Sequence, residues 1–347
     1  MVRIGTLLSL ASAFLASEGA ISGARAEDDF FGGKTITILV GNGPGGGYDA
    51  STRIFARHLA KHIPGNPTIV PRNMPGAGGL NLANTLYNVA PKDGTTLGVF
   101  AASIALEPIF GNSLASYDPG QFEWIGSLER DTPSCAVWKG AGQEIKTLDD
   151  LIHAKNTVIF GASASGATTS QHAMLLKRYF NAPLKVIYGF RGVNDVKLAL
   201  QRGEVNATCG MLESTVRSVF MSEYKSGDLK IFVQFGPKRA VPFFGSATRL
   251  YDRARNEQDR LTFDVIFKQA ELSRPFAAPP GVPLDRISIL RKAMIETSRD
   301  PQLIADAAKV SIEYNPVPGE ETHDIFASYA SIPAETIKAA RDLIEPE

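Results

Sequence analysis

The residues best suited to bind a ligand lie in a glycine-rich loop near the N-terminus. The stretch TILVGNGPGGGYDASTRIF, residues 37–55, leads from an apolar run through a glycine cluster into an amphipathic segment. Glycine lets backbone N–H groups approach a ligand closely, and a helix that starts after such a loop presents unpaired N–H groups and the positive end of its dipole. The pattern favours capture of a carboxylate or a phosphate, although the same glycines would also serve a tight turn.

The same loop contains a match to the dinucleotide-binding fingerprint. Gly41, Gly43 and Gly46 spell G-x-G-x-x-G. That fingerprint requires an acidic residue about 20 positions later to hold a ribose hydroxyl. The corresponding region reads TIVPRNMP, with Arg72 and Asn73 and no acid. The sequence therefore argues against a nucleotide and indicates no cofactor.

An exported serine hydrolase is the alternative from another class. Gly161, Ser163 and Ser165 approach the G-x-S-x-G nucleophile elbow but lack its last glycine. His172 follows, inside an expected helix, where a histidine more often packs or caps than acts as a base. Catalysis would need one of these serines within hydrogen-bond reach of His172. Metal-ligand spacing is not apparent either, so we expect a binding protein without a metal rather than an enzyme.

Asp49 has two possible roles. Its carboxylate most simply caps a helix beginning at Ala50, because it can accept hydrogen bonds from N–H groups of the first turn. As a ligand contact it would repel a carboxylate unless it bound a hydroxyl, an amine or water. We favour the cap.

Four segments repeat one local pattern, a β-branched run followed by a small-residue loop and a helical pattern. The expected strands are residues 36–40, 68–70, 157–160 and 185–188, and Gly203 is placed to stop the last helix. Repeated strand–loop–helix units predict an α/β protein with mostly parallel sheets covered on both faces. Ligands of such sheets bind at the carboxyl ends of the strands, which is where all four loops must lie.

Two stretches are long enough to cross between domains, residues 117–138 and 229–236. We therefore expect two lobes with a ligand cleft between them. The first lobe is discontinuous, with residues 27–132 and 236–347, and the second comprises residues 133–235.

The N-terminus predicts export. Arg3, the apolar stretch 4–16 and the Ala24-Arg25-Ala26 cleavage site form a secretory signal peptide of residues 1–26. With 36 basic and 36 acidic residues the chain is formally neutral, which argues against nucleic acid or an anionic membrane surface as partner. Cys135 and Cys209 could form one disulfide in an oxidising compartment or remain two buried thiols.

The order and spacing of several motifs resemble one family across residues 35–345. ITILVGNGPGGGYDASTRIFARHL, NMPGAGGLNLAN, PKDGTTLGVF, YDPGQFEWIGSL, SGATTSQH and GFRGVNDVKLALQRGEVNA are similar to stretches of the substrate-binding receptors of tripartite tricarboxylate transporters, the Bug family. The resemblance implies a monomeric, type II-like periplasmic binding protein with two hinge crossings. It would close on a small organic acid, with a di- or tricarboxylate favoured, and deliver it to a permease made of a large and a small membrane subunit. A sensory receptor would use the same closure.

The resemblance also implies which residues contact the ligand. One carboxylate would be held between the loops at 45–49 and 76–79, and the second lobe would contribute the loop at 164–169 and the turn at 190–192. Arg191 would either grip a second carboxylate bidentately or point into solvent. The implied ligand-binding residues are Gly47, Tyr48, Asp49, Ala77, Gly78, Ala102, Ser103, Ser165, Thr168, Thr169, Phe190 and Arg191.

Overall fold

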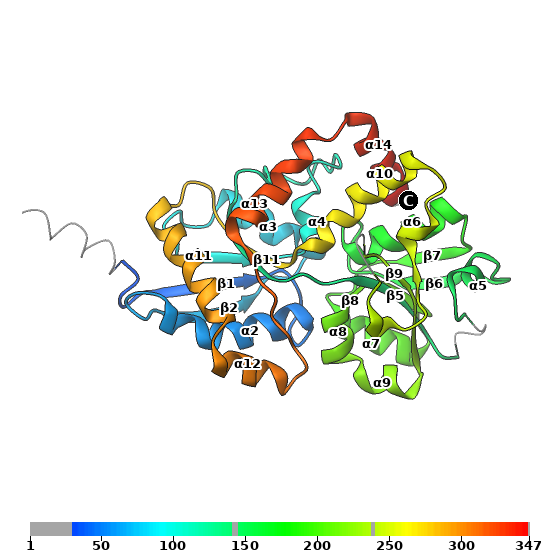
Figure 1. Ribbon diagram of the computed structural model, residues 1–347, viewed down its shortest axis with the longest axis horizontal. Helices are drawn as coiled ribbons and strands as arrows, with labels where there is room; N and C mark the ends of the chain where they lie inside the picture. The colour runs from blue at the N-terminus through cyan, green and yellow to red at the C-terminus, as the bar shows by residue number, and fades with distance from the viewer. Residues whose placement is uncertain (1–29, 141–144, 237–239, 346–347) are drawn as a thin grey trace, which may run out of the picture.

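The computed structural model describes residues 30–140, 145–236 and 240–345, and the expected signal peptide lies outside them. It contains two six-stranded mixed sheets, which form the two lobes that stand side by side in Figure 1. The strand order is β12-β4-β11-β3-β1-β2 in the first sheet and β10-β9-β5-β8-β6-β7 in the second. The expected two-lobed α/β architecture is confirmed, but the sheets are mixed and not mostly parallel as expected, because β4, β5, β11 and β12 form antiparallel pairs.

The two sheets are built alike. In each, a first strand pairs in parallel with two others, β1 with β2 and β3, and β6 with β7 and β8. The next strand, β11 or β5, is antiparallel. The first sheet comprises β1 (Thr35–Val40), β2 (Thr68–Asn73), β3 (Thr96–Val99), β4 (Glu123–Glu129), β11 (Ser273–Ala278) and β12 (Val317–Pro318). The second comprises β5 (Pro133–Trp138), β6 (Val158–Gly161), β7 (Leu184–Ile187), β8 (Ala207–Leu212), β9 (Leu229–Gln234) and β10 (Thr248–Arg249).

Helices cover the sheets. Those of the first lobe are α2 (Gly47–Leu59), α3 (Leu80–Asn88), α4 (Ala102–Ala105), α11 (Leu284–Ser298), α12 (Pro301–Ala308) and α13 (Gly319–Ala327). Those of the second are α5 (Leu148–Ile152), α6 (Thr168–Phe180), α7 (Val193–Arg202), α8 (Glu213–Val219), α9 (Met221–Ser226), α10 (Glu257–Phe267) and α14 (Ala334–Ile344). Short 3-10 helices are η1 (Ala60–His62), η2 (Ala77–Gly79), η3 (Pro242–Phe244), η4 (Leu250–Arg253), η5 (Lys268–Glu271) and η6 (Ser328–Ser331).

The four predicted strand–loop–helix units are present as β1–α2, β2–α3, β6–α6 and β7–α7. In α2, Phe55 and Leu59 are buried four residues apart, as the helical period requires. At the end of α7, Gly203 adopts a left-handed φ of +73°, and its N–H bonds to carbonyls of the last turn. Local pattern therefore sufficed to locate these elements.

The first crossing lies between β4 and β5, inside the stretch expected for it. The second lies later than the expected residue 236, because β10 pairs in parallel with β9 in the second sheet and the chain returns only in β11. Phe263 and Phe267 of α10 pack against Tyr179 and Phe235 of the second lobe, which holds this segment there. The last helix, α14, also packs on α6 and α10 (Figure 1), so residues 334–344 leave the first lobe again.

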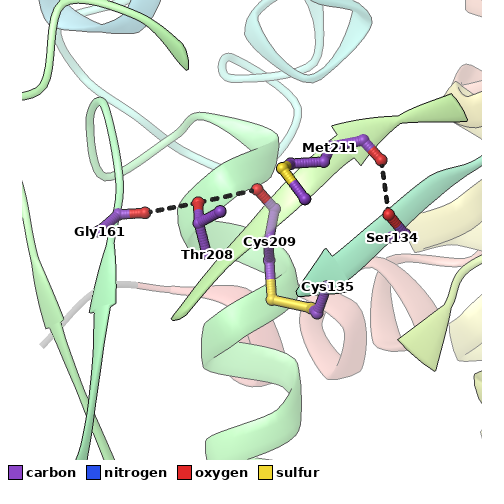
Figure 2. The surroundings of a disulfide bond; sticks show 6 residues. All are labelled: Ser134, Cys135, Gly161, Thr208, Cys209 and Met211. Atoms are coloured by element: carbon purple, nitrogen blue, oxygen red, sulfur yellow. Dashed lines mark hydrogen bonds between the residues drawn. A yellow bond between two sulfur atoms is a disulfide. The ribbon is translucent and has the colours of Figure 1, made fainter. Parts of the chain in front are cut away.

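Cys135 and Cys209 form a disulfide that joins neighbouring strands β5 and β8 (Figure 2). Both residues are fully buried. Beside the bond, the Ser134 hydroxyl donates to the Met211 carbonyl at 2.9 Å. The covalent link thus lies in the middle of the second sheet.

Within the described residues, no helix is both long and apolar enough to cross a bilayer.

Candidate functional site

Two adjoining hollows lie between the lobes, with empty volumes of about 640 Å³ and 590 Å³. We name them the Val196 hollow and the Thr168 hollow, after a residue that lines only one of them. Asn42 follows β1 and Ser163 follows β6, so the hollows lie at the carboxyl ends of parallel strands, as expected. The wall shared by both hollows consists of Asn42, Tyr48, Ser163, Thr169, Gly210 and Leu212.

Three of the helices that begin at the walls of these hollows are ten residues or longer. They are α2, which starts at Gly47, α6, which starts at Thr168, and α7, which starts at Val193; none has a side-chain hydrogen bond at its N-cap. An uncapped helix start offers its N–H groups to a ligand, and its dipole stabilises a nearby negative charge by about 0.3–1 kcal/mol. Helices from both lobes therefore favour an anion in the same cleft.

Hydrogen bonds join the lobes across the cleft. The Gly43 N–H donates to the Arg191 carbonyl at 3.0 Å, and the Thr168 hydroxyl donates to the Ser103 hydroxyl at 3.0 Å. Gly78, with a φ of +69°, lies against the second lobe so closely that a Cβ there would be 2.9 Å from the Ala164 Cβ. The structure therefore has the lobes in contact around the hollows.

Asp49 holds the glycine loop in place. The helix starts at Gly47, not at Ala50, so Asp49 lies in its first turn and is not its N-cap. Its carboxylate accepts from Gly45 N, Arg53 Nε and Asn73 Nδ2, each at 2.8 Å. Burial alone would raise the pKa of Asp49, but these hydrogen bonds hold it below its usual value. The carboxylate thus ties the loop to the end of β2, which corrects the expected cap.

Arg274 lies behind the Val196 hollow, at the second crossing. It is fully buried in β11 with a left-handed φ of +61°, and it pairs with Glu129 at the end of β4. Its guanidinium also donates to the Gly47 carbonyl at 3.2 Å and the Ser214 hydroxyl at 2.9 Å. Burial lowers the pKa of Arg274 to about 10, which leaves it charged at neutral pH. The side chain therefore links the start of α2 in one lobe to the start of α8 in the other.

Ser214 extends this linkage into the first crossing. Its hydroxyl donates to Asp131 Oδ2 at 2.5 Å, and Asp131 also accepts from the backbone N–H groups of Glu213 and Ser214. Burial raises the pKa of Asp131 to about 6, against the hydrogen bonds from Ser214. Both crossings are thus joined through one polar network.

The residues expected at the site take different places. Ser103 bonds to Thr168, Ala77 precedes Gly78 in η2, and Phe190 packs beside Gly161. Ser165 lines a separate hollow with Glu107. Arg191 is 77% exposed and paired with Asp195, at the rim. The expected residues that line the two central hollows are Gly47, Tyr48, Gly78, Ala102, Thr168 and Thr169.

Several wall residues were not anticipated as ligand contacts. Half of those named below come from β8 and α8, where the strand leads directly into the helix without the loop of the four units identified from sequence. Others lie in or beside the loops of the four units identified from sequence, where only the fold shows which side chains face the cleft. The unanticipated residues include Asn42, Ser163, Val193, Val196, Thr208, Gly210, Met211 and Thr215.

His172 does not form a catalytic pair. It is 1% exposed, and its ring stacks on Phe235 with the centroids 3.9 Å apart. Neither ring nitrogen has a hydrogen-bond partner among the described residues, so neither Ser163 nor Ser165 reaches it. The hydrolase alternative loses the geometry on which it depends.

Lowering the pH from 7 to 5 should reduce the free energy of unfolding by about 2 kcal/mol through His172. Burial lowers the pKa of this imidazole from 6.5 to about 3. Between these pKa values the unfolded state binds a proton and the folded state does not. The contribution of His172 to the free energy of unfolding is therefore fully present above pH 6.5 and is lost as the pH falls towards 3. Urea unfolding at both pH values measures the effect. A His172→Met variant should lack this part of the pH dependence, and an unchanged dependence in that variant would refute the assignment.

In the part of the chain that the structure describes, no cluster of three or more His, Cys, Asp or Glu side chains could hold a metal ion.

The chain is similar in sequence to two UPF0065 proteins. One, from Agrobacterium vitis, is 27% identical over 205 residues, covering 58% of this chain and 57% of its own length. The chain thus spans little more than half of that relative. The other, from Cupriavidus necator, is 24% identical over 326 residues, covering 93% of this chain and 90% of its own length. No protein-family model matches.

The fold matches several solved structures, among them that of the periplasmic binding protein BugD. BugD superposes with a TM-score of 0.70 at 18% identity, covering 90% of this chain and 99% of BugD. MatC from Rhodopseudomonas palustris with bound malate gives a TM-score of 0.68 at 19% identity, covering 90% of this chain and 99% of MatC. Rpa4515 of R. palustris with adipate gives a TM-score of 0.68 at 17% identity, covering 90% of this chain and 98% of Rpa4515. These matches show that the chain shares the fold that the resemblance implied.

Proposed function

We propose that this chain, which has the sequence resemblance and the fold of Bug-type periplasmic solute-binding proteins, captures a small organic carboxylate and delivers it to a membrane permease. The convergence of α2, α6 and α7 carries this proposal. Their uncapped starts belong to both lobes and meet at one cleft. Malate and adipate in two structures of the same fold support a carboxylate.

Closure of the lobes would provide the affinity. A ligand in the shared wall contacts Asn42 and Tyr48 of one lobe and Ser163 and Thr169 of the other. Only the closed state makes both sets of contacts, so ligand raises its population by the difference in affinity between the two states. Among the residues expected from sequence, we propose Gly47, Tyr48, Gly78, Ala102, Thr168 and Thr169 as contacts. Asp49 and Ser103 would act by holding these groups in place.

A thermal-shift panel on the mature protein tests the proposal. The panel contains mono-, di- and tricarboxylates, aromatic acids, amino acids, sugars, phosphate and NAD, and the protein is first unfolded without reductant and refolded to release bound solute. Ligand at 100 times its dissociation constant stabilises the folded state by about 2.7 kcal/mol, which should raise the melting temperature by several degrees. A shift by carboxylates supports the proposal, whereas a shift by sugars or NAD alone would overturn it.

Transport and sensing differ in what the closed lobes contact. We favour transport, with the large and small membrane subunits implied by the family resemblance as partners and the periplasm as location. Reconstitution of the purified protein with these subunits in vesicles separates the two roles. Uptake that depends on this protein supports transport, and closure without uptake favours a sensory partner.

Replacing Gly78 by alanine should weaken ligand binding by about 10- to 100-fold. The new Cβ would lie 2.9 Å from the Ala164 Cβ of the second lobe, so it obstructs the closed state. The left-handed φ of +69° adds a cost of roughly 1–2 kcal/mol. Isothermal titration with the strongest-binding acid of the panel measures the loss.

Gly227→Ala is the matched control. Gly227 has a φ of +78° and nothing within 4 Å of an added Cβ, so it carries the same kind of backbone cost without an obstruction. It should lower stability but leave affinity within about twofold, since surface changes away from the site have small effects. Equal losses of affinity in both variants would contradict closure at Gly78.

A further inference from the structure

Neither central hollow is lined by a charged side chain of the described residues. The walls instead combine glycines with hydroxyl, amide and apolar side chains. Three arginines that occur in or beside the segments forming the walls are each paired with a carboxylate of this chain. The pairs are Arg53–Asp49, Arg191–Asp195 and Arg274–Glu129. The cleft therefore presents helix starts and hydroxyl groups to a ligand. None of these three arginines is available as an unpaired cation.

Three polar side chains outside the shared wall donate hydrogen bonds within the protein. The Thr208 hydroxyl donates to the Gly161 carbonyl at 2.9 Å, and Gln269 Nε2 donates to the Ile266 carbonyl at 2.8 Å. Thr168 donates to Ser103. These groups donate to atoms of the protein, so they are less available to donate to a ligand.

The shared wall retains a free donor. Thr169 Oγ1 accepts from Ser163 N at 3.1 Å and lies 3.3 Å from Ser163 Oγ. The two hydroxyls carry two hydrogens, and the contact between them uses one. One O–H is left for a ligand, in the first turn of α6, where the dipole favours negative charge.

Beyond the shared wall, the Val196 hollow is mostly apolar. It is bordered by Val193 and Val196 of α7, by Met211 of β8 and by Cys209, which is bonded to Cys135. An apolar group of a ligand in this hollow would bury its own hydrocarbon surface and that of the wall, which favours binding. Two helices that start at this hollow, α2 and α7, each carry an aspartate in the first turn, whereas α6 carries no acid there. A second carboxylate in the Val196 hollow would therefore lose its hydration without meeting a cation or a helix start as favourable as that of α6.

We infer that the ligand carries one carboxylate on an apolar body. The carboxylate binds at Ser163, Thr169 and the start of α6, and the body occupies the Val196 hollow. This inference rests on the proposed function, whose carboxylate site it uses. It replaces the di- or tricarboxylate that the family resemblance favours.

Titration calorimetry with hexanoate, adipate and hexanamide tests the inference, because the three share one chain length and differ in charge. Hexanoate should bind at least 10-fold more tightly than adipate, and hexanamide more weakly than hexanoate. Adipate binding as tightly as hexanoate would overturn the inference and leave the proposed function standing. If neither these acids nor any other carboxylate of the panel binds, both fail.

A cation placed in the Val196 hollow should change the preference. Val193 is half-buried at the start of α7, so a lysine there can keep its ammonium group hydrated. Val193→Lys should bring the affinity for adipate to that for hexanoate or above it. Leu198→Lys, on the same helix at a side chain 48% exposed, adds the same charge away from the hollow and should leave the preference unchanged. An unchanged preference in a folded Val193→Lys protein would contradict the placement of the body.

Discussion

Replacing Arg274 by methionine should lower the free energy of unfolding by about 3–5 kcal/mol, because it leaves a buried carboxylate without its partner. Arg274 is fully buried and Glu129 is 5% exposed, and the two form an ion pair between β11 and β4. Methionine fills a similar volume and leaves the backbone at its left-handed φ, so the lost charge dominates the change. Urea denaturation followed by circular dichroism measures it.

The double variant Glu129→Leu/Arg274→Met should recover much of this loss. Removing both charges avoids the uncompensated carboxylate, and apolar replacements of buried ion pairs are often neutral. Arg260→Met, at an exposed position of α10, is the matched control and should change stability by less than about 0.5 kcal/mol. A loss below about 1 kcal/mol in the single variant would exclude the pair as a major contributor.

Removing the disulfide with Cys135→Ala/Cys209→Ala should lower the free energy of unfolding by about 4 kcal/mol. The bond closes a loop of sequence separation 74, for which loss of chain entropy in the unfolded state predicts about this value. Thermal unfolding with and without reductant measures the change.

Reductant provides the control for the disulfide. Reductant should lower the free energy of unfolding of the natural protein, because it cleaves the disulfide when unfolding exposes it. It should not affect the double variant. Both cysteines are fully buried, so reduction of the native protein should be slow and should follow opening of the second sheet. Equal stability of the natural protein in both conditions would show that the bond does not stabilise the fold.

Local pattern accounts for much of the architecture. The βα units could be found because each depends on residues a few positions apart, as in α2 with its buried Phe55 and Leu59 and in α7 with its stop at Gly203. The position of the cleft followed, because parallel strands place their carboxyl ends at one edge.

Position in the cleft is not a local property. Asp49 was expected to cap its own helix, but its partner Asn73 lies in another strand, 24 residues away. Ser165 and Thr168 are only three residues apart, yet they line different hollows. Small differences in backbone direction decide which side chains face the ligand, and residue types do not reveal them.

The sequence by itself determined the α/β class, the two lobes, the glycine loops at the helix starts and the resemblance to a family. Only the tertiary structure decided that Cys135 is bonded to Cys209, that β10 and α14 belong to the second lobe, and that Arg274 meets Glu129. Each of these depends on contacts between segments far apart in the chain. Such contacts form because separate elements bury apolar surface together, and that packing cannot be read from any one segment.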